Sequence, residues 1–309
     1  MVLFPNCKIN LGLDVLRRRP DGYHDIETFM FPVRGLTDVL EIVPAAGDGV
    51  EFSGSGLVLD CPPEKNLCLK AYELMRTIRR CLPGDGAGAS GGRQVLAGVR
   101  MHLHKAIPSG AGLGGGSADA AYAVRGLNGL FGLGLDEDSM ESLATRLGSD
   151  TAFFVRNVPA LATGRGEVLT PFPLSLAGKV LVIVKPGVAV STAQAYASIT
   201  PRVPAVPLAE RLARPLAEWR ECLTNDFEAP VFGMHPILAR IKRKLYDAGA
   251  VYAAMSGSGA ALFGIFEPAR ERIGPEGALF ETTESFARDI ASVLEREFGP
   301  LFFHCGRME

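Results

Sequence analysis

The stretch PSGAGLGGGSA lies in the middle of the chain and consists of Pro108, Ser109, Gly110, Ala111, Gly112, Leu113, Gly114, Gly115, Gly116, Ser117 and Ala118. Five of these residues are glycine, and without a Cβ atom the backbone N–H groups can turn inward and approach an anion closely. Apolar residues then recur with the spacing of one helix face, at Ala120, Ala123, Val124, Leu127, Leu130 and Phe131. The pattern predicts a loop that enters a helix near Ser117, with Asp119 in its first turn, and helix N-termini favour phosphate.

Three kinds of phosphate loop compete for this stretch. The dinucleotide fingerprint G-x-G-x-x-G is present at Gly110, Gly112 and Gly115, but it should follow a buried parallel strand. Here residues 99–104 alternate between apolar and polar side chains, which is typical of a half-exposed strand. A Walker loop needs a lysine before its final serine, and Gly116 stands there instead. The third kind is the glycine- and serine-rich loop of the kinases named for galactose, homoserine, mevalonate and phosphomevalonate. A flexible glycine turn is the plain structural alternative.

The composition is that of a globular protein with one large or two medium domains. The chain has 309 residues, of which 47% are hydrophobic and 21% charged, and its net charge is −2. This charge argues against a nucleic-acid groove or an anionic-membrane patch, so a phosphate site must be local. There is neither a signal-peptide pattern nor an apolar run approaching the ~20 residues of a spanning helix. The six cysteines form no Cys-x-x-Cys pair and no zinc pattern, so we expect a cytoplasmic protein with reduced thiols.

The N-terminal region predicts a strand followed by a tight turn. Ile9, Leu11, Leu13 and Val15 alternate with Lys8, Asn10, Gly12 and Asp14, so Lys8 and Asn10 share one strand face. A lysine on such a face is usually solvated. Pro20-Asp21-Gly22 is a turn signal, because proline presets φ and glycine accepts a positive φ. The turn presents Tyr23 and His24 side by side, either as surface residues or as a holder for a flat polar ring.

The rest of the chain continues the mixture of helices and strands. We expect helices at 66–78, 136–147, 191–196, 237–248 and 286–294, strands at 180–184 and on both sides of the glycine turn 256–259, and an exposed, mobile glycine-rich loop at 83–92. Asp150 precedes the apolar run 152–155, and on position alone it is an N-cap. A turn-forming run at 163–167 is followed by two prolines, at 171 and 173. This change predicts a domain boundary, with a first domain over residues 1–162 and a second over 163–309.

Several blocks together resemble the GHMP kinase family over nearly the whole chain. Its motifs are matched by the glycine loop, by PNCKINL from Pro5, by RPDGYH from Arg19, and by LGSDTAFF from Leu147. The blocks GRGE from Gly164, KPG from Lys185, TNDFE from Thr224 and MSGSG from Met255 follow in the family's order. The RPDGYH segment resembles the branch of the family that acts on a cytidyl diphosphate sugar alcohol. The sequence departs from the family pattern in three places. Cys7 replaces an alanine, Ala118-Asp119 replaces Ser-Asn, and the 83–92 loop looks inserted.

The resemblance implies an α+β fold of two domains. The N-terminal domain would resemble domain 2 of ribosomal protein S5 and carry the ATP loop over Pro108–Ala118, and the C-terminal domain would be ferredoxin-like. It also implies ATP-dependent phosphorylation of an alcohol in the non-mevalonate route to isoprenoid precursors. Mg²⁺ would be held by phosphates and water, with no dedicated protein ligands. The expected partner is this small-molecule substrate, not nucleic acid or membrane, and the oligomeric state stays open.

The resemblance also gives roles to single residues. Asp150 would accept the hydroxyl proton, and Lys8 would stabilise the charge that develops on the same hydroxyl. Tyr23 and Tyr196 would sandwich the cytosine, with His24 at its polar edge. Asn10 and Thr192 would hydrogen-bond to the substrate.

Three other functions remain possible from the sequence. A sister kinase of homoserine or mevalonate has no need of a ring sandwich. A catalytically silent binding protein on the same fold predicts loss of Lys8 or Asp150, and both are present. A dinucleotide oxidoreductase rests on the glycine pattern alone.

Overall fold

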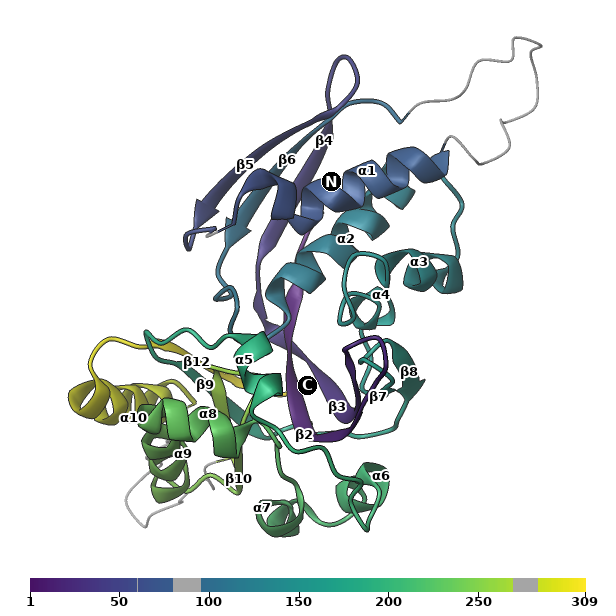
Figure 1. Cartoon of the computed structure of the whole chain (residues 1–309). Coiled ribbons are helices and arrows are strands. Elements are labelled where there is room, and N and C mark those ends of the chain that lie inside the picture. Colours follow the sequence, from purple (N-terminus) through teal and green to yellow (C-terminus); the bar gives the residue numbers. More distant parts are fainter. Residues whose placement is uncertain (60, 80–95, 269–282) are drawn as a thin grey trace. The chain divides into compact units, whose positions relative to one another are not determined.

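The computed structural model describes residues 1–59, 61–79, 96–268 and 283–309 (Figure 1). The predicted 83–92 loop lies outside the described residues. The chain forms two compact units, and each is made of separate stretches. Unit 1 comprises Met1–Cys7, Thr37–Ser109 and Gly114–Val158, and unit 2 comprises Lys8–Leu36, Gly110–Leu113 and Pro159–Glu309. The boundary at residues 162 and 163 stays a prediction.

Unit 1 is a four-stranded sheet with helices packed on it. The sheet order is β1-β4-β6-β5, with β1 at Val2–Leu3, β4 at Val39–Pro44, β6 at Val99–Lys105 and β5 at Val50–Gly56. Strand β5 runs parallel to β6, and α1 (Leu67–Arg79) lies between them in the sequence, while the other pairs are antiparallel. Helix α2 (Gly115–Leu130) packs against α1 and β4 (Figure 1). The short helices α3 (Glu137–Ala144) and α4 (Phe153–Arg156) pack against α2.

Helix α2 confirms the helix predicted after the glycine loop, with one difference. Its buried face is built from Ala118, Ala120, Ala121, Ala123, Val124 and Leu127. The helix begins at Gly115, so Asp119 lies beyond the first turn, where we had expected it. Its side chain is buried and contacts Lys105, because the helix turns this position toward the sheet.

Unit 2 contains two further sheets of four strands. One has the order β2-β3-β7-β8, with β2 at Asn6–Arg18, β3 at His24–Thr37, β7 at Ala160–Thr163 and β8 at Val168–Pro171. The other is fully antiparallel in the order β10-β11-β9-β12, with β10 at Tyr252–Met255, β11 at Leu262–Phe266, β9 at Val180–Lys185 and β12 at Phe302–Arg307. The two strands around the 256–259 turn are therefore confirmed as an antiparallel pair.

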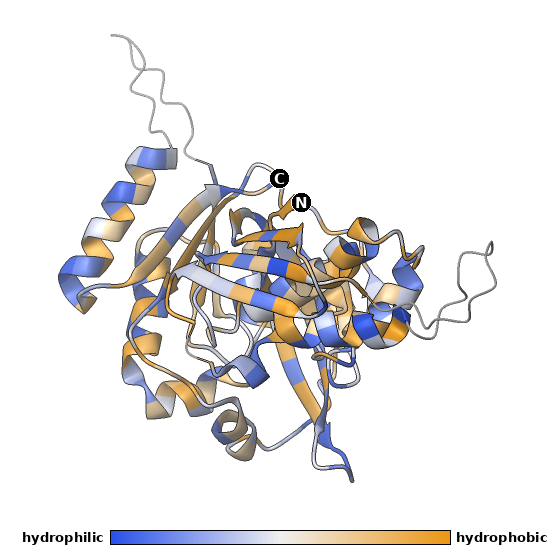
Figure 2. Ribbon diagram, turned by 90° about the horizontal axis from the view of Figure 1, so that it is seen from above, coloured by the Kyte–Doolittle hydropathy of each residue, from blue (hydrophilic) through white to orange (hydrophobic). Residues whose placement is uncertain are grey.

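The helices of unit 2 are short except for two. They are α5 (Thr192–Ala197), α6 (Leu208–Leu212), α7 (Trp219–Cys222), α8 (Glu228–Met234), α9 (Pro236–Asp247) and α10 (Thr283–Phe298). Helix α9 packs on β10 and β11, and α10 packs on β12 and α9, each through an apolar stripe opposite a polar face (Figure 2). Short 3₁₀ turns lie at Pro63–Lys65 and Leu216–Glu218. Together with the sheets, these helices confirm the α+β fold.

Two local predictions were wrong. Strand β2 is buried on both faces as far as Val15, so Lys8 and Asn10 are not solvated; each is 2% exposed. The period of two shows which residues share a strand face, but it does not show whether that face meets water. Helix α3 ends at Ala144, before Leu147, because Thr145 closes it and a turn follows. No helix among the described residues is long and apolar enough to cross a membrane.

Candidate active site

The middle of the glycine loop, Gly110–Leu113, belongs to unit 2 and is hydrogen-bonded to two other segments of it. The backbone N–H of Lys8 donates to the carbonyl of Leu113 at 2.9 Å. The N–H of Ala261 donates to the carbonyl of Ala111 at 3.0 Å. The loop is thereby fixed to β2 on one side and to the strand after the 256–259 turn on the other.

Gly112 is the point of closest approach in this part of the loop. Its φ is +79°, and a Cβ atom there would lie 1.9 Å from the backbone oxygen of Ser256. The Ser256 hydroxyl in turn donates to the Gly112 carbonyl at 2.8 Å. A side chain at position 112 is therefore excluded by both the backbone conformation and the space. Ser256, in the MSGSG block, thereby supports the loop.

A chain of hydrogen bonds starts at Lys8 and continues through the sheet. Lys8 Nζ donates to Asn10 Oδ1 at 2.5 Å, and Asn10 Nδ2 donates to Thr28 Oγ1 at 2.9 Å. Thr28 then donates to the carbonyl of Gly12 at 2.7 Å. The Asn10 side chain is thus held at both ends, which fixes the oxygen that receives the Lys8 ammonium. Thr28 was not predicted from the sequence, and no motif marks it.

Helix α2 offers an anion-binding end. Its N-cap is Gly114 in the left-handed conformation, and among the described residues no side chain caps its first turn. The N–H groups of the first helical residues, Gly115 to Ser117, have no partner within the helix. The positive end of the helix dipole adds to them, so this terminus is suited to phosphate.

Asp150 lies in unit 1, in the turn between α3 and α4, and is partly exposed. The expectation that Asp150 is an N-cap is wrong, because the N-cap of α4 is Ala152, two residues further on. The neighbouring Thr151 is fully buried, and its Oγ1 atom has no hydrogen-bond partner among the described residues.

The predicted ring-binding residues make two separate ring contacts in unit 2. The rings of His24 and Tyr196 stack with centroids 4.8 Å apart and planes inclined by 17°. The Arg165 guanidinium lies over the Tyr23 ring, 5.0 Å from its centroid, and Tyr23 is 57% exposed. Tyr196 therefore faces His24 in this structure. Burial and the nearby Arg18 lower the pKa of His24, which keeps its imidazole neutral at neutral pH.

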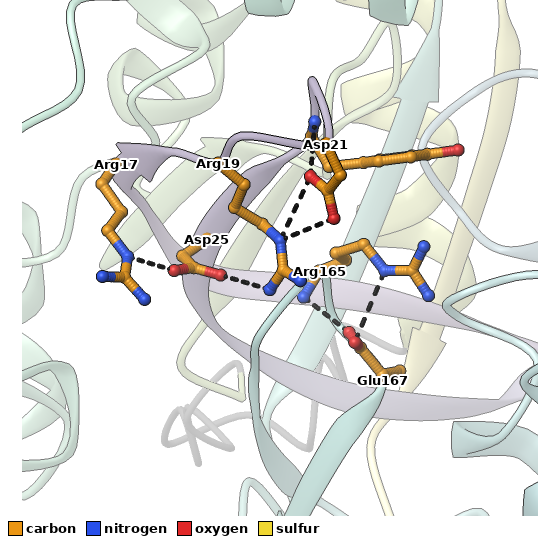
Figure 3. A network of polar contacts seen from close by, with 7 residues as sticks. Arg17, Arg19, Asp21, Asp25, Arg165 and Glu167 are labelled. Atoms are coloured by element: carbon orange, nitrogen blue, oxygen red, sulfur yellow. Dashed lines mark hydrogen bonds and ion pairs between the residues drawn. The ribbon is translucent and has the colours of Figure 1, made fainter.

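The turn that carries Tyr23 and His24 is held by a network of charged side chains (Figure 3). Asp25 receives Arg17 and Arg19, and Arg19 also contacts Asp21 at 3.1 Å. The Tyr23 N–H donates to Asp21 Oδ1 at 3.1 Å. Exposed pairs of this kind contribute little stability one by one, but several sharing partners restrict the conformations of the turn. Figure 3 also shows Arg165 beside Glu167. The Glu167 carboxylate accepts hydrogen bonds from both the backbone N–H and the guanidinium of Arg165.

Two further site predictions are placed as follows. Thr192 is the first residue of α5, and its Oγ1 lies 2.9 Å from the Ser258 hydroxyl. The helix predicted at 191–196 is confirmed, and Ser191 is its N-cap. A cavity of about 220 Å³ in unit 2, between the end of β3 and β12, has none of the predicted site residues in its lining, so it is not part of this site.

Comparison with known proteins decides the family. The model of the GHMP kinase N-terminal domain matches residues 66–157, and that of the GHMP kinase C-terminal domain matches residues 206–274. The chain belongs to the GHMP kinase family. Because kinases of this family use ATP, the chain is an ATP-dependent enzyme.

Curated GHMP kinases resemble this chain along most of its length. The 4-diphosphocytidyl-2-C-methyl-D-erythritol kinase of Parabacteroides distasonis is 47% identical over 267 residues, which is 86% of this chain and 92% of that protein. The protein of the same name from Bacteroides thetaiotaomicron is 46% identical over 284 residues, which is 91% of this chain and 95% of that protein.

Solved structures of GHMP kinases agree with the fold. A crystal structure of 4-(cytidine 5'-diphospho)-2C-methyl-D-erythritol kinase superposes with a TM-score of 0.74 at 31% identity, covering 99% of this chain and 98% of that one. Mevalonate kinase from Methanococcus jannaschii superposes with a TM-score of 0.68 at 13% identity, covering 100% of this chain and 98% of that one. At that identity the second likeness concerns the fold alone.

Proposed function

We propose that this GHMP kinase transfers the γ-phosphoryl group of ATP to the 2-hydroxyl of 4-diphosphocytidyl-2-C-methyl-D-erythritol, in the non-mevalonate pathway of isoprenoid precursor synthesis. The observation that carries the proposal is the identity of 46–47% to kinases of that name over most of both chains. The stacked pair of His24 and Tyr196 supports it, because a flat aromatic surface suits a nucleobase. A cytoplasmic location is part of the proposal.

The nucleotide fits the end of α2. Gly116 in the first turn of α2 is exposed, and no side chain of the described residues caps that turn, so its N–H groups are suited to phosphate oxygens. No group of three or more His, Cys, Asp or Glu side chains suited to a metal occurs in the described part of the chain. In this proposal Mg²⁺ is held by the phosphates and water, where it would supply charge neutralisation.

Lys8 and Asp150 are the proposed catalytic residues. Phosphoryl transfer requires alignment and charge stabilisation more than covalent help from the protein. Asp150 would accept the proton of the attacking hydroxyl, as the aspartate of a kinase does in general base catalysis. Lys8, whose ammonium position is fixed by Asn10 and Thr28, would stabilise the developing negative charge. Asn10 and Thr192 would bind the substrate.

The proposed cytosine site involves Tyr23, Tyr196 and His24. Rings whose centroids are 4.8 Å apart leave no room for a third ring between them. A cytosine between Tyr23 and Tyr196 therefore requires His24 to leave the face of Tyr196. As a neutral imidazole, His24 can then accept or donate a hydrogen bond at the edge of the base.

The experiment that tests the function is ADP release with ATP, Mg²⁺ and each candidate alcohol in turn. We expect turnover with the cytidyl substrate and not with homoserine or mevalonate. Asp150→Asn should lower kcat by roughly 10²–10⁴-fold while nucleotide affinity is retained. Asp138→Asn, at an exposed carboxylate of α3, is the matched control. Turnover of homoserine alone would overturn the proposal, and an unchanged kcat in Asp150→Asn would remove the base but not the substrate.

A second experiment tests the ring site separately. Tyr196→Ala should raise KM for the cytidyl substrate by about tenfold or more, since stacking a base on an aromatic side chain contributes ~1–3 kcal/mol. Tyr196→Phe keeps the ring and should retain the KM. Neither variant should change KM for ATP, and an equal rise in both KM values would place Tyr196 outside the cytosine site.

A further inference from the structure

A buried cluster of three charged residues lies in unit 1 beneath the start of α2. Lys105 Nζ lies 2.5 Å from Asp38 Oδ2 and 2.5 Å from Asp119 Oδ2. The three side chains are 0–4% exposed. None of the sequence motifs or proposed catalytic roles accounts for Lys105 or Asp38. Burying three charges is unfavourable unless each is paired and hydrogen-bonded, so the cluster needs an explanation.

The cluster is attached to both ends of the glycine loop that lie in unit 1. Asp38 Oδ1 accepts the N–H groups of Ala106 at 2.6 Å and Ile107 at 2.8 Å, which are the residues that lead into the loop. Asp119 projects from α2, the helix into which the loop leads. Lys105 joins the two carboxylates. The entry to the loop and the helix after it are therefore tied together through a single ammonium group.

The same ammonium group lies directly under the first residue of α2. A Cβ atom at Gly115 would be 3.1 Å from Lys105 Nζ and 2.9 Å from Ile107 Cγ2. The cluster thus reaches the first turn of α2, whose N–H groups would face phosphate under the proposed function. A charge in the cluster would act on a phosphate bound there at short range, because water screens buried charges less than exposed ones.

The charges in the cluster do not balance when both carboxylates are ionised. Two carboxylates and one ammonium give a net charge of −1. Asp119 Oδ1 has no hydrogen-bond partner in the described part of the chain, which leaves its ionised form incompletely satisfied. Besides Lys105 and Asp38, the titratable group that faces Asp119 is the buried thiol of Cys68 on α1, whose pKa is raised well above its usual value by burial.

We infer that Asp119, held by Lys105 and Asp38, is a positioning residue of the phosphate loop, and that bound nucleotide favours its protonated form. The reasoning rests on the proposed binding of ATP at this loop. A proton on Asp119 brings the net charge of the cluster to zero beneath an anionic ligand. Burial, the main cause, and the charge of Asp38 raise the pKa of Asp119 to about 7 against the opposing effect of Lys105, so the proton is exchangeable near neutral pH.

The test is calorimetric titration of the whole enzyme with ATP and saturating Mg²⁺, which keeps the terminal phosphate deprotonated. The heat is compared in buffers of different ionisation enthalpy at pH 7, which gives the protons taken up on binding. We expect uptake of a fraction of a proton per nucleotide, and an affinity that weakens roughly threefold to tenfold between pH 6 and pH 8. Asp119→Asn should abolish both the uptake and the pH dependence, and should bind at pH 8 as tightly as the wild type does at pH 6.

Two comparisons keep the test decisive. Asp138→Asn, at an exposed carboxylate of the same unit, should behave as the wild type does. Should Asp119→Asn fail to fold, Asp119→Ser removes the same charge with a smaller side chain and is used instead. No uptake by the wild type, or uptake that persists without Asp119, would overturn the inference. Absence of any ATP binding would instead overturn the proposed function.

Discussion

Two buried lysines on different strands, Lys8 on β2 and Lys105 on β6, have different kinds of partner. In unit 2, Lys8 donates to the neutral amide of Asn10, which is itself fixed by Thr28. In unit 1, Lys105 lies between the carboxylates of Asp38 and Asp119. The same residue type at nearly the same burial thus serves two purposes. Lys105 compensates charges that the fold has already buried, whereas Lys8 has its position set by a hydrogen-bonded chain near the predicted substrate residues.

The largest expected effect is on stability, at the carboxylate-bound lysine. Lys105→Met leaves Asp38 and Asp119 buried without their cation, and breaking a buried pair in this way costs about 3–5 kcal/mol. The free energy of unfolding from urea titration measures it. Lys70→Met, at an exposed lysine on α1 of the same unit, is the control. Equal stability of the two variants would break the comparison, since Lys105 would then compensate nothing.

The second effect is on the rate, at the amide-bound lysine. Lys8→Met should lower kcat by roughly 10²–10³-fold, which is typical when one group that stabilises transition-state charge is removed. Stability should change less than in Lys105→Met. Steady-state kinetics with ATP and the cytidyl substrate measure the rate. Lys179→Met, at a partly exposed lysine of unit 2 paired with Glu267, should leave kcat unaltered. A kcat of Lys8→Met within a factor of about three of the wild type would contradict the proposed role.

Sequence reasoning singled out the glycine loop and Lys8 as site residues but not Lys105, and the reason is physical. Motif positions depend on local backbone requirements, such as the left-handed conformation of Gly112 and Gly114, and these are visible in the residue types. The pairing of Lys105 with Asp38 and Asp119 is long-range and has no local signature. One signal was present: Lys105 continues the buried alternation of Val99, Met101 and Leu103, which places it on the apolar side of β6.

The aromatic site illustrates the same limit in unit 2. The turn predicted at 20–22 is present, and Tyr23 and His24 follow it directly. The turn signal could not predict which ring would face Tyr196, because that depends on how α5 packs near the start of β3. The Arg165 contact to Tyr23 likewise joins residues that are far apart in the chain. A turn can be predicted from its own residues, whereas side-chain partners from distant segments of the chain cannot.

The third effect is smaller and concerns the support of Lys8. Thr28→Val keeps the shape of the side chain but removes its hydroxyl, so the Asn10 amide and the Gly12 carbonyl each lose a bond. Leaving such buried groups unsatisfied costs about 1–3 kcal/mol of unfolding free energy. The rate should fall less than in Lys8→Met, because the ammonium itself remains. Thr170→Val, at an exposed threonine on β8, is the control. A larger loss of rate than in Lys8→Met would mean that Thr28 contacts substrate itself.

The smallest effect distinguishes the two lysine sites by their dependence on pH. The pKa of Asp119 is raised from 3.8 to about 7 in the folded protein, mainly by burial, so between those values the folded chain binds more protons than the unfolded one. Stability from this group is therefore present at low pH and is lost as pH rises through that window. Asp119→Asn has no proton to lose at this position. The melting temperature of the variant, relative to that of the wild type at the same pH, should therefore be a few degrees higher at pH 8 than at pH 5. Thermal unfolding at both pH values measures this difference, and Lys8→Met, whose partner amide does not titrate, provides the contrast. A constant difference between Asp119→Asn and the wild type at both pH values would show that the carboxyl keeps one protonation state throughout, and the unit 1 cluster would then be as fixed in charge as the Asn10 and Thr28 chain of unit 2.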